Sequence, residues 1–311
     1  MRETIIAIVG PTAVGKTELS IEIAKRFNGE VISGDSMQVY KGMDIGTAKI
    51  SSEEMQGVPH HLLDIKEPDE AYSAADFKVH VQRLVKEISD KGRLPIIVGG
   101  SGLYIQAALF DYNFPDIKRD EELTEQLEKQ AQEEGIEEIY ERLQQVDPKQ
   151  AEKIHPNNHR RVIRALEIYE TSGKPKSEWE LEQTVETPYN VIFIGLEMDR
   201  TELYEQINHR VDFMLEKGLL DEVKSLYNHG FKDTQAMRAI GYKEFIPYLE
   251  GKQTLEEAVE QLKQNSRRYA KRQYTWFRNK LAIDWYAVSP SSRREKFKMI
   301  FDKLAGILKM K

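Results

Sequence analysis

Residues 10–17 read GPTAVGKT, a spacing of glycine, lysine and threonine that can hold a phosphate group. Gly10 and Gly15 let backbone N–H groups approach phosphate oxygens, and Lys16 adds a compact positive charge. The Thr17 hydroxyl suits a Mg²⁺ ligand, and the start of the following helix adds its partial positive charge. The loop is completed by Pro11, Thr12, Ala13 and Val14. The segment therefore predicts a binding site for a phosphorylated ligand together with Mg²⁺.

The rest of the chain must show whether that ligand is a nucleoside triphosphate. Enzymes that hydrolyse ATP with such a loop normally carry an acidic residue at the end of a second strand. The best candidate strand, LPIIVGG, continues into Ser101 and Gly102 without a carboxylate. The sequence therefore disfavours a motor-type ATPase, whereas a small-molecule kinase stays open.

Asp35 is the first candidate for acid–base chemistry. It lies in SGDSMQVYKGMDIGTAK, directly after the second expected strand. Because the carboxyl ends of parallel strands face the ligand crevice, Asp35 is expected on the same rim as the phosphate loop. There it could act as the general base for an incoming nucleophile. Its position alone is equally compatible with a helix N-cap shared with Ser36 or with a Mg²⁺ partner.

The elements around these residues alternate between strand and helix. Strand-like runs are ETIIAIVG, EVISGDS, HHLLDI and RLPIIVGG, and helix-like runs are KTELSIEIAKRF and AADFKVHVQRLVKEISDKG. Apolar strands that alternate with helices indicate a parallel sheet covered on both faces. We therefore expect an α/β fold, with a P-loop NTPase-like parallel sheet flanked by helices.

A change in composition after Phe110 indicates an insertion. Helical sequence rich in Glu and Gln is followed by a second, basic helix, HPNNHRRVIRALEIYETSGKP, and the strand-like run YNVIFIGLEMD then resumes the core pattern. We predict a mainly helical insertion domain of residues 113–187. The P-loop core would comprise residues 1–112 and 188–311, including the C-terminal helices.

Composition limits the class and location of the protein. Hydrophobic residues make up 40% and charged residues 31% of the 311 residues, as in ordinary soluble globular proteins. The lack of cysteine excludes disulfides, thiolate catalysis and cysteine-based zinc sites. An apolar run begins at Thr4, which leaves no room for a signal peptide, and no run approaches the length of a membrane span. We therefore expect a cytoplasmic protein without membrane contact.

The formal net charge is −7, but positive charge is concentrated in two helical segments. No acidic residue occurs between Gln261 and Ile283. This stretch carries Arg267, Arg268, Lys271 and Arg272 among aromatic residues, and the insertion carries Arg160, Arg161 and Arg164. A charge run is often only a solvated helix face, yet the lack of acidic neighbours favours contact with RNA phosphates.

Eight longer segments follow one another along the chain, namely GPTAVGKT, DSMQVYKGMDIGTAK, PHHLLDI, YSAADF, VGGSGLY, HPNNHRR, AIGYKE and AKRQYTWFR. Together they resemble the tRNA dimethylallyltransferase family, also called tRNA isopentenyltransferases. The resemblance spans Gly10 to Arg278, and DSMQVYKGMDIGTAK is long and highly specific. The chain differs from the family in two ways. Ser101 stands where the family usually has threonine, and the zinc-finger tail of eukaryotic relatives is missing.

The resemblance implies transfer of a dimethylallyl group from dimethylallyl diphosphate to N6 of adenosine 37 in tRNAs that read codons beginning with U. The products would be N6-(dimethylallyl)adenosine and diphosphate. Asp35 aligns with the family's general base. The phosphate loop, with Mg²⁺ held partly by Thr17, would neutralise the leaving group. Arg238 matches a family arginine expected to reach the same diphosphate, although the sequence alone supports a surface ion pair equally well.

The resemblance also implies a tRNA anticodon stem-loop as partner. A loop base can be splayed out more cheaply than a base in a duplex. Asp35, Ser36, Met37 and Gln38 are placed to meet it, and Gln38 could donate to or accept from a base edge. Ser101 matches a family position that touches the tRNA near the target nucleotide. The insertion and both basic groups would contact the tRNA, no obligate protein partner is evident, and a monomer is expected.

Two rival hypotheses stay open. A P-loop kinase would use Asp35 to deprotonate a hydroxyl and would have to bind and consume ATP, whereas the transferase consumes dimethylallyl diphosphate. An RNA-binding protein with a vestigial loop would bind tRNA but would not depend on Asp35 for any reaction.

Overall fold

The chain divides into two compact units in a computed structural model that describes residues 2–110, 112, 120–182 and 186–309. One unit comprises residues 1–109 and 187–311, and the other comprises residues 110–186. The insertion was expected at residues 113–187, and residues 113–119 lie outside the described part of the chain. Each unit has its own hydrophobic core.

The larger unit is built on a parallel sheet, which has six strands in the described residues. In chain order the strands are β1 (Thr4–Val9), β2 (Gly29–Ser33), β3 (His60–His61), β4 (Leu94–Gly99), β5 (Asn190–Glu197) and β6 (Asp284–Ala287). Across the sheet their order is β3-β2-β4-β1-β5-β6. The expected α/β fold with a parallel sheet flanked by helices is confirmed.

The strand β3 is much shorter than the sequence suggested. The run HHLLDI was expected to form a strand, but only His60 and His61 pair with β2. Leu62 and Asp64 have φ angles of 63° and 53°, in the left-handed region. An extended strand cannot continue through such residues, so the pairing ends at His61.

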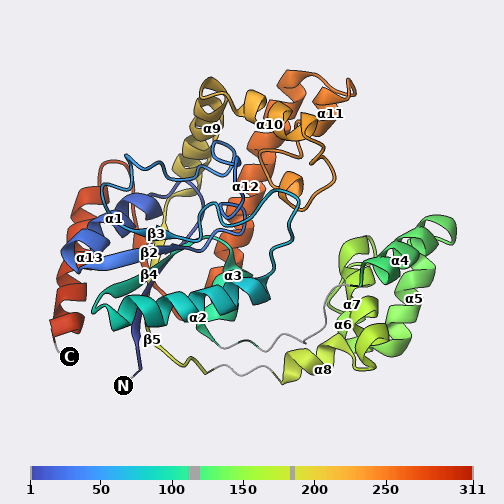
Figure 1. Ribbon diagram of the computed structural model, residues 1–311, viewed down its shortest axis with the longest axis horizontal. Coiled ribbons are helices and arrows are strands. Elements are labelled where there is room, and N and C mark those ends of the chain that lie inside the picture. Colours follow the sequence, from blue (N-terminus) through green and yellow to red (C-terminus); the bar gives the residue numbers. More distant parts are fainter. Residues whose placement is uncertain (1, 111, 113–119, 183–185, 310–311) are drawn as a thin grey trace. The chain divides into compact units, whose positions relative to one another are not determined.

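Helices cover both faces of the sheet (Figure 1). Helix α1 (Lys16–Arg26) and helix α13 (Arg293–Lys309) lie on one face, and α2 (Ala74–Asp90) and α3 (Gly102–Leu109) lie on the other. Apolar residues of α1 and α13, such as Leu19 and Phe297, share a core with Ile6 and Ile8 of β1. Because both faces are covered, β1 is a continuous apolar run and not an alternating one.

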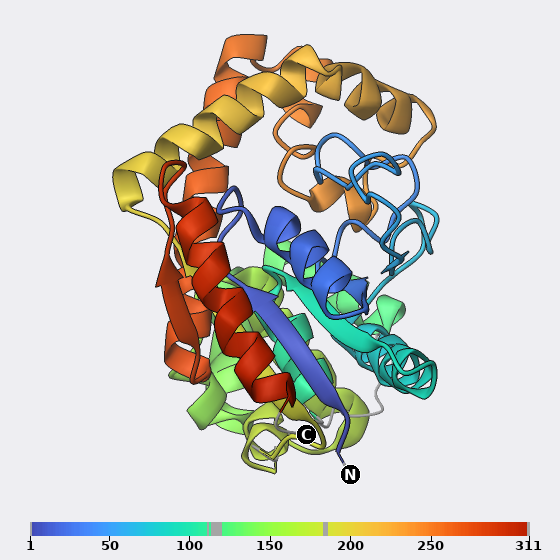
Figure 2. The ribbon, with the colours of Figure 1, turned by 90° about the vertical axis from the view of Figure 1, so that its left-hand side faces the viewer.

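Helices of the C-terminal half extend beyond the carboxyl ends of the strands (Figure 2). They are α9 (Arg200–Glu216), α10 (Leu219–Asn228), the 3₁₀ turn η1 (Ala236–Arg238), α11 (Ile246–Leu249) and α12 (Leu255–Lys280). Helix α12 begins with a capping box, in which Thr254 and Glu257 each accept a hydrogen bond from the other's amide. Its 26 residues make a helix about 39 Å long, so one element can carry residues both to the sheet and beyond it.

The smaller unit is helical throughout its described part. Its helices are α4 (Glu121–Glu133), α5 (Ile136–Val146), α6 (Pro148–Ala151), α7 (His159–Ser172) and α8 (Lys176–Leu181). Leu127, Ile139, Leu143 and Leu166 pack together in its core. None of the helices in the described residues of either unit combines the length and apolar character needed to cross a membrane.

Candidate active site

A cavity of about 860 Å³ opens at the carboxyl edge of the sheet in the larger unit. The phosphate loop, the segment after β2, helix α9 and helix α12 all contribute to its wall. Lys16, Asp35 and Arg272 therefore face one space although they lie far apart in the sequence. The phosphate-loop residues on the wall are Thr12, Ala13, Val14, Gly15, Lys16 and Thr17, while Gly10 and Pro11 are buried behind them.

The phosphate loop connects β1 to α1 and closes on itself. A Cβ at Gly10 would lie 2.4 Å from the Leu196 carbonyl oxygen, so only glycine fits there. Gly15 precedes α1 with a φ of 96°, which favours glycine. The Lys16 ammonium donates to the carbonyl oxygens of Gly10 and Pro11 across the loop. This geometry presents the N-terminus of α1 to the cavity, where its N–H groups can meet an anion.

The order of the strands places the end of β4 between the phosphate loop and Asp35. β4 lies between β1, which leads into the phosphate loop, and β2, which leads into Asp35. A Cβ at Gly99 would lie 2.3 Å from the Gly34 carbonyl oxygen, so the loops after β2 and β4 touch through their backbones. The Ser101 hydroxyl accepts from the Ser36 amide at 3.2 Å. The glycine-rich end of β4, which has no carboxylate, therefore serves as a close-packed spacer.

Asp35 forms a turn with its own backbone instead of capping a helix. Its Oδ1 atom accepts from the Met37 amide at 2.8 Å, and no helix of the described residues starts there. Burial raises the pKa of the Asp35 carboxyl above its ordinary value, while the Met37 amide and the positive charges of Lys16 and Arg210 act in the opposite direction. The carboxylate is therefore oriented by the backbone and influenced by two cations.

Arg210 of α9 is a site residue that the sequence analysis missed. It lines the cavity, and its charge acts on both Lys16 and Asp35. Burial, reinforced by Arg210, lowers the pKa of Lys16 to about 7, and Asp35 opposes this change. Burial also lowers the pKa of Arg210, against the opposing effect of Asp35. Two cations that share one carboxylate favour an anionic ligand, because a further negative charge would stabilise both.

Positive charge dominates the wall of the cavity. Its acidic residues are Glu18 and Asp35, and its arginines and lysines are Lys16, Arg210, Arg238, Lys243, Arg272 and Arg293. Arg293 comes from the start of α13, donates to Glu18 at 3.0 Å and lies against Gly15 of the phosphate loop. The predicted residue Arg238 is exposed on the same wall. Such a wall suits a ligand with several negative charges.

Gln38 holds the segment after Asp35 instead of presenting a free amide. Its side-chain oxygen accepts from the Ser33 hydroxyl at 2.8 Å, and its nitrogen donates to the Thr47 carbonyl at 3.2 Å. The side-chain oxygen keeps a second lone pair, so the expected contact of Gln38 with a base edge stays a prediction. Gln38 still lies on the cavity wall together with Ser36 and Met37.

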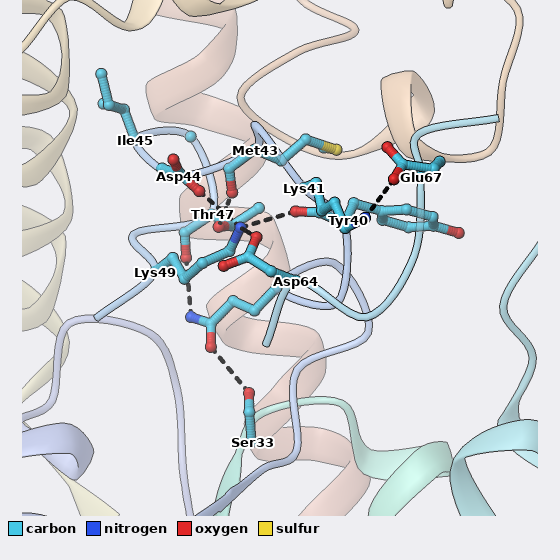
Figure 3. A network of polar contacts seen from close by, with 12 residues as sticks. Ser33, Tyr40, Lys41, Met43, Asp44, Ile45, Thr47, Lys49, Asp64 and Glu67 are labelled. Atoms are coloured by element: carbon cyan, nitrogen blue, oxygen red, sulfur yellow. Dashed lines mark hydrogen bonds and ion pairs between the residues drawn. The ribbon is translucent and has the colours of Figure 1, made fainter. Parts of the chain in front are cut away.

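Charged groups anchor the rest of this segment from two sides. Lys49 donates to Asp44 and Asp64 at 2.6 Å each (Figure 3). The Glu222 carboxylate of α10 accepts from the consecutive amides of residues 44–46 at 2.9, 2.8 and 3.0 Å. Most of the long motif DSMQVYKGMDIGTAK therefore shapes the wall of the cavity, and its two ends contribute lining residues.

Most of the basic segment lies in α12, and other elements neutralise part of its charge. Lys263 pairs with Asp212 at 2.7 Å, and Arg278 pairs with Glu197. Arg267 donates to the Asn208 side chain. Residues 261–283 contain no acidic residue, but carboxylates from other parts of the chain approach this stretch in space.

Three of the predicted residues of α12 stay available to a phosphate backbone. Arg268, Lys271 and Arg272 are exposed, and Arg268 and Lys271 have no ion pair within the described part of the chain. The Arg272 guanidinium lies 5.6 Å from the centre of the Tyr269 ring and also lines the cavity. The basic face therefore reaches the mouth of the cavity.

The second basic group lies on α7 in the smaller unit. Arg160 and Arg161 are exposed in the first turn of the helix. Arg164 pairs at 2.6 Å with Glu167, which is only 1% exposed. Arg164 is therefore engaged within its own unit, and Arg160 and Arg161 are the outward-facing members of the group.

The cavity wall also carries large apolar side chains, which the sequence analysis could not locate. They include Met37, Ile50, Leu63, Ile207, Phe213, Met214, Ile240 and Leu262. Phe213 is 55% exposed despite its size. An apolar group attached to the bound anion would find a matching surface here.

Comparisons with known proteins assign the chain to a family. The model of the family described as IPP transferase matches residues 38–280. The chain belongs to the IPP transferase family. Two curated relatives, both named tRNA dimethylallyltransferase, come from Oceanobacillus iheyensis and Geobacillus thermodenitrificans. They are 57% and 55% identical over all of this chain and 99% of their own lengths. The chain is therefore an enzyme, a prenyltransferase.

Solved structures of IPP transferases agree with the fold over almost the whole chain. A full-length tRNA isopentenylpyrophosphate transferase from Bacillus halodurans is 52% identical, with a TM-score of 0.74 over 99% of this chain and 98% of its own. A eukaryotic dimethylallyltransferase described as acting on tRNA is 35% identical, with a TM-score of 0.79 over 93% of this chain and 75% of its own. The family model begins at residue 38, but the full-length relatives also cover the phosphate loop and Asp35.

Proposed function

We propose that this IPP transferase moves a dimethylallyl group from dimethylallyl diphosphate to N6 of adenosine 37 in tRNAs that read codons beginning with U. The common cavity carries the proposal, because the phosphate loop and Asp35 face one space with a cationic wall. The names of the curated relatives and the eukaryotic structure described as acting on tRNA support it.

The diphosphate of the donor would bind at the phosphate loop. Lys16 would exchange its bonds to Gly10 and Pro11 for diphosphate oxygens, and Arg210 would face the same group. Negative charge grows on the bridging oxygen as the C–O bond breaks. Lys16, Arg210 and the N-terminus of α1 would therefore stabilise the transition state more than the bound donor, which is what catalysis requires.

Mg²⁺ fits this site through Thr17. The threonine lies exposed in the first turn of α1 and lines the cavity. Mg²⁺ usually keeps several waters and binds substrate phosphates, and the threonine hydroxyl of a phosphate loop is a typical protein ligand for it. When bound, the ion would neutralise charge on the departing diphosphate.

Asp35 would receive the acceptor amine. The lone pair of adenine N6 is delocalised into the ring, so the amine needs an acceptor that orients it. The Asp35 carboxylate faces the cavity and is held by the Met37 amide. The C–N bond forms as the C–O bond to diphosphate breaks, and the proton passes from N6 to Asp35 once alkylation has made it acidic.

The apolar part of the wall would enclose the dimethylallyl chain. Phe213, Met214 and Ile240 belong to this surface and line the same cavity as the phosphate loop. An allylic group with cation character reacts with water unless water is excluded, so these side chains would protect it. The site then contains a surface for each part of the donor.

A transfer assay with two tRNAs tests the proposed function. Unmodified tRNA and labelled dimethylallyl diphosphate, without any nucleotide, should give label in N6-(dimethylallyl)adenosine after nucleoside analysis. The same tRNA with guanosine at position 37 lacks the N6 amine and should take up no label. Label in both tRNAs would contradict the acceptor assignment. Consumption of ATP in the absence of tRNA would favour the kinase.

The basic face of α12 should contribute to the electrostatic part of tRNA binding. The variant Arg268→Gln/Arg272→Gln is expected to weaken tRNA binding and to reduce the slope of log Kd against log salt concentration by about 1 to 2. The control Arg294→Gln/Lys298→Gln removes two exposed charges from α13 and should leave the slope unchanged. An unaltered slope in the α12 variant would show that the basic face of this helix is exposed to solvent and does not contact the tRNA.

A further inference from the structure

We infer that Gln273 of α12 is a positioning residue that sets the distance between the diphosphate-binding loop and Asp35. The inference rests on the proposed function, since it concerns the spacing of donor and acceptor in that reaction. Gln273 is only 5% exposed and lies on the cavity wall, in the middle of the basic segment. Because this amide is uncharged and buried, its role differs from the RNA contact expected of the exposed arginines and lysines around it.

The Gln273 side chain bonds to both sides of the site. Its Oε1 atom accepts from the Thr12 amide of the phosphate loop at 3.0 Å. Its Nε2 atom donates to the Gly100 carbonyl at 3.1 Å. One planar amide therefore bridges the loop after β1 and the loop after β4.

Two glycines let α12 pack directly on the loop after β4. A Cβ at Gly100 would lie 1.9 Å from the Gln273 Nε2 atom, and a Cβ at Gly102 would lie 2.2 Å from the Trp276 ring. A side chain at Gly100 would displace the Gln273 amide, and a side chain at Gly102 would displace the Trp276 ring. The segments VGGSGLY and AKRQYTWFR therefore form one structural unit, although 173 positions separate Gly100 from Gln273.

The loop after β4 also contacts the segment that carries Asp35. Ser101 follows Gly100 directly and accepts from the Ser36 amide at 3.2 Å, while its hydroxyl donates to the Ser36 hydroxyl at 3.4 Å. Ser36 is the chain neighbour of Asp35. A continuous set of contacts thus links Gln273 to the residue beside the proposed base.

Tyr269 lies one helical turn before Gln273 on α12, and its hydroxyl belongs to the same group of contacts. It lies beside the side chains of Ser101 and Gln273, and burial raises the pKa of Tyr269 to about 12. The hydroxyl therefore keeps its proton at neutral pH.

This arrangement matters because the two reacting groups are held by different loops. The donor would bind to the loop after β1, and the acceptor amine would meet the loop after β2. Reacting atoms must approach to about 3 to 3.5 Å, and a misplacement of about 1 Å can cost about 100-fold in rate. Gln273 joins the two loops through the β4 spacer, so its loss should lower the rate of the chemical step.

Gln273→Met tests the inference, because methionine is similar in length but forms neither hydrogen bond. We expect kcat to fall about 10- to 100-fold, with tRNA Kd changed by less than about twofold. The matched control Gln264→Met alters an exposed glutamine of the same helix and should keep the wild-type kcat. A Gln273→Met enzyme with the wild-type kcat would overturn the inference. If the wild-type enzyme itself transfers no dimethylallyl group, the proposed function is overturned instead.

A double-mutant cycle separates positioning from general stability. Ser101→Ala breaks the next contact along the same path, so its loss in kcat and that of Gln273→Met should be non-additive. Strictly additive losses would contradict a shared path. Should Gln273→Met unfold at the assay temperature, Gln273→Glu keeps the acceptor for the Thr12 amide and removes the donor to Gly100. A wild-type kcat in that folded variant would equally overturn the inference.

Discussion

Asp35→Asn is expected to reduce kcat for prenyl transfer about 1,000-fold while tRNA binding stays close to that of the wild-type enzyme. Asparagine has nearly the shape of aspartate, and its side-chain oxygen can still accept from the Met37 amide, which Asp35 binds at 2.8 Å. Its amide cannot take a proton from the alkylated amine. Single-turnover kinetics with saturating tRNA and donor would measure the loss directly.

The matched control for this substitution is Asp69→Asn, which removes the same charge from an exposed position. It should transfer at the wild-type rate. An Asp35→Asn enzyme with unchanged kcat would remove Asp35 from the mechanism. Loss of tRNA binding together with the rate would assign Asp35 to binding and not to proton transfer.

The pH profile gives a second readout of the same residue. Burial raises the pKa of Asp35, although Lys16 and Arg210 oppose the shift. The base is lost as the pH falls through its pKa, so the acid limb of the rate should have its midpoint above the ordinary aspartate pKa of about 3.9. The limb should be missing in Asp35→Asn. An acid limb that persists there would belong to another group.

Lys16→Met is expected to lower kcat/KM for dimethylallyl diphosphate about 100- to 1,000-fold. Methionine keeps the length of the stem but loses the charge that faces the diphosphate. Burial and the charge of Arg210 lower the pKa of Lys16 to about 7. Binding of the diphosphate should therefore favour the protonated amine, so the ammonium should act mainly on the bound donor and the leaving group.

Lys25→Met serves as the control, because this exposed lysine lies on the same helix but away from the cavity. It should keep the wild-type kcat/KM. Melting temperatures would show whether Lys16→Met loses activity by unfolding, since Lys16 also closes the phosphate loop onto Gly10 and Pro11. A folded Lys16→Met enzyme with normal kcat/KM would show that the loop does not bind the donor.

The sequence predicted those features that depend on neighbouring residues. The strand and helix around GPTAVGKT, and the position of Asp35 after β2, follow from local patterns and from the rule that parallel strands end at one edge. The prediction of a strand over HHLLDI was wrong beyond His61, because Leu62 and Asp64 have left-handed backbone conformations that end the strand. Nothing in the pattern of apolar residues reveals a local reversal of this kind.

Features that depend on tertiary contacts were missed or misread. Arg210 lies in an ordinary helical run, and only the packing of α9 brings its charge near Lys16 and Asp35. The bonds of the Gln38 amide to Ser33 and Thr47 could not be seen in the sequence, and its expected contact with a base stays a prediction. The stretch without acidic residues is partly neutralised in space, for example where Lys263 pairs with Asp212 of another helix. Each of these contacts can be seen only in the folded structure.

The stoichiometry of a single reaction tests the central claim, namely that the phosphate loop holds a leaving diphosphate and not a nucleoside triphosphate. Wild-type enzyme, unmodified tRNA, Mg²⁺ and dimethylallyl diphosphate are mixed without nucleotide, and released pyrophosphate and N6-(dimethylallyl)adenosine are both quantified. We predict equal molar amounts of the two products at every time point. Pyrophosphate release without modified nucleoside, or a reaction that requires ATP, would contradict the account.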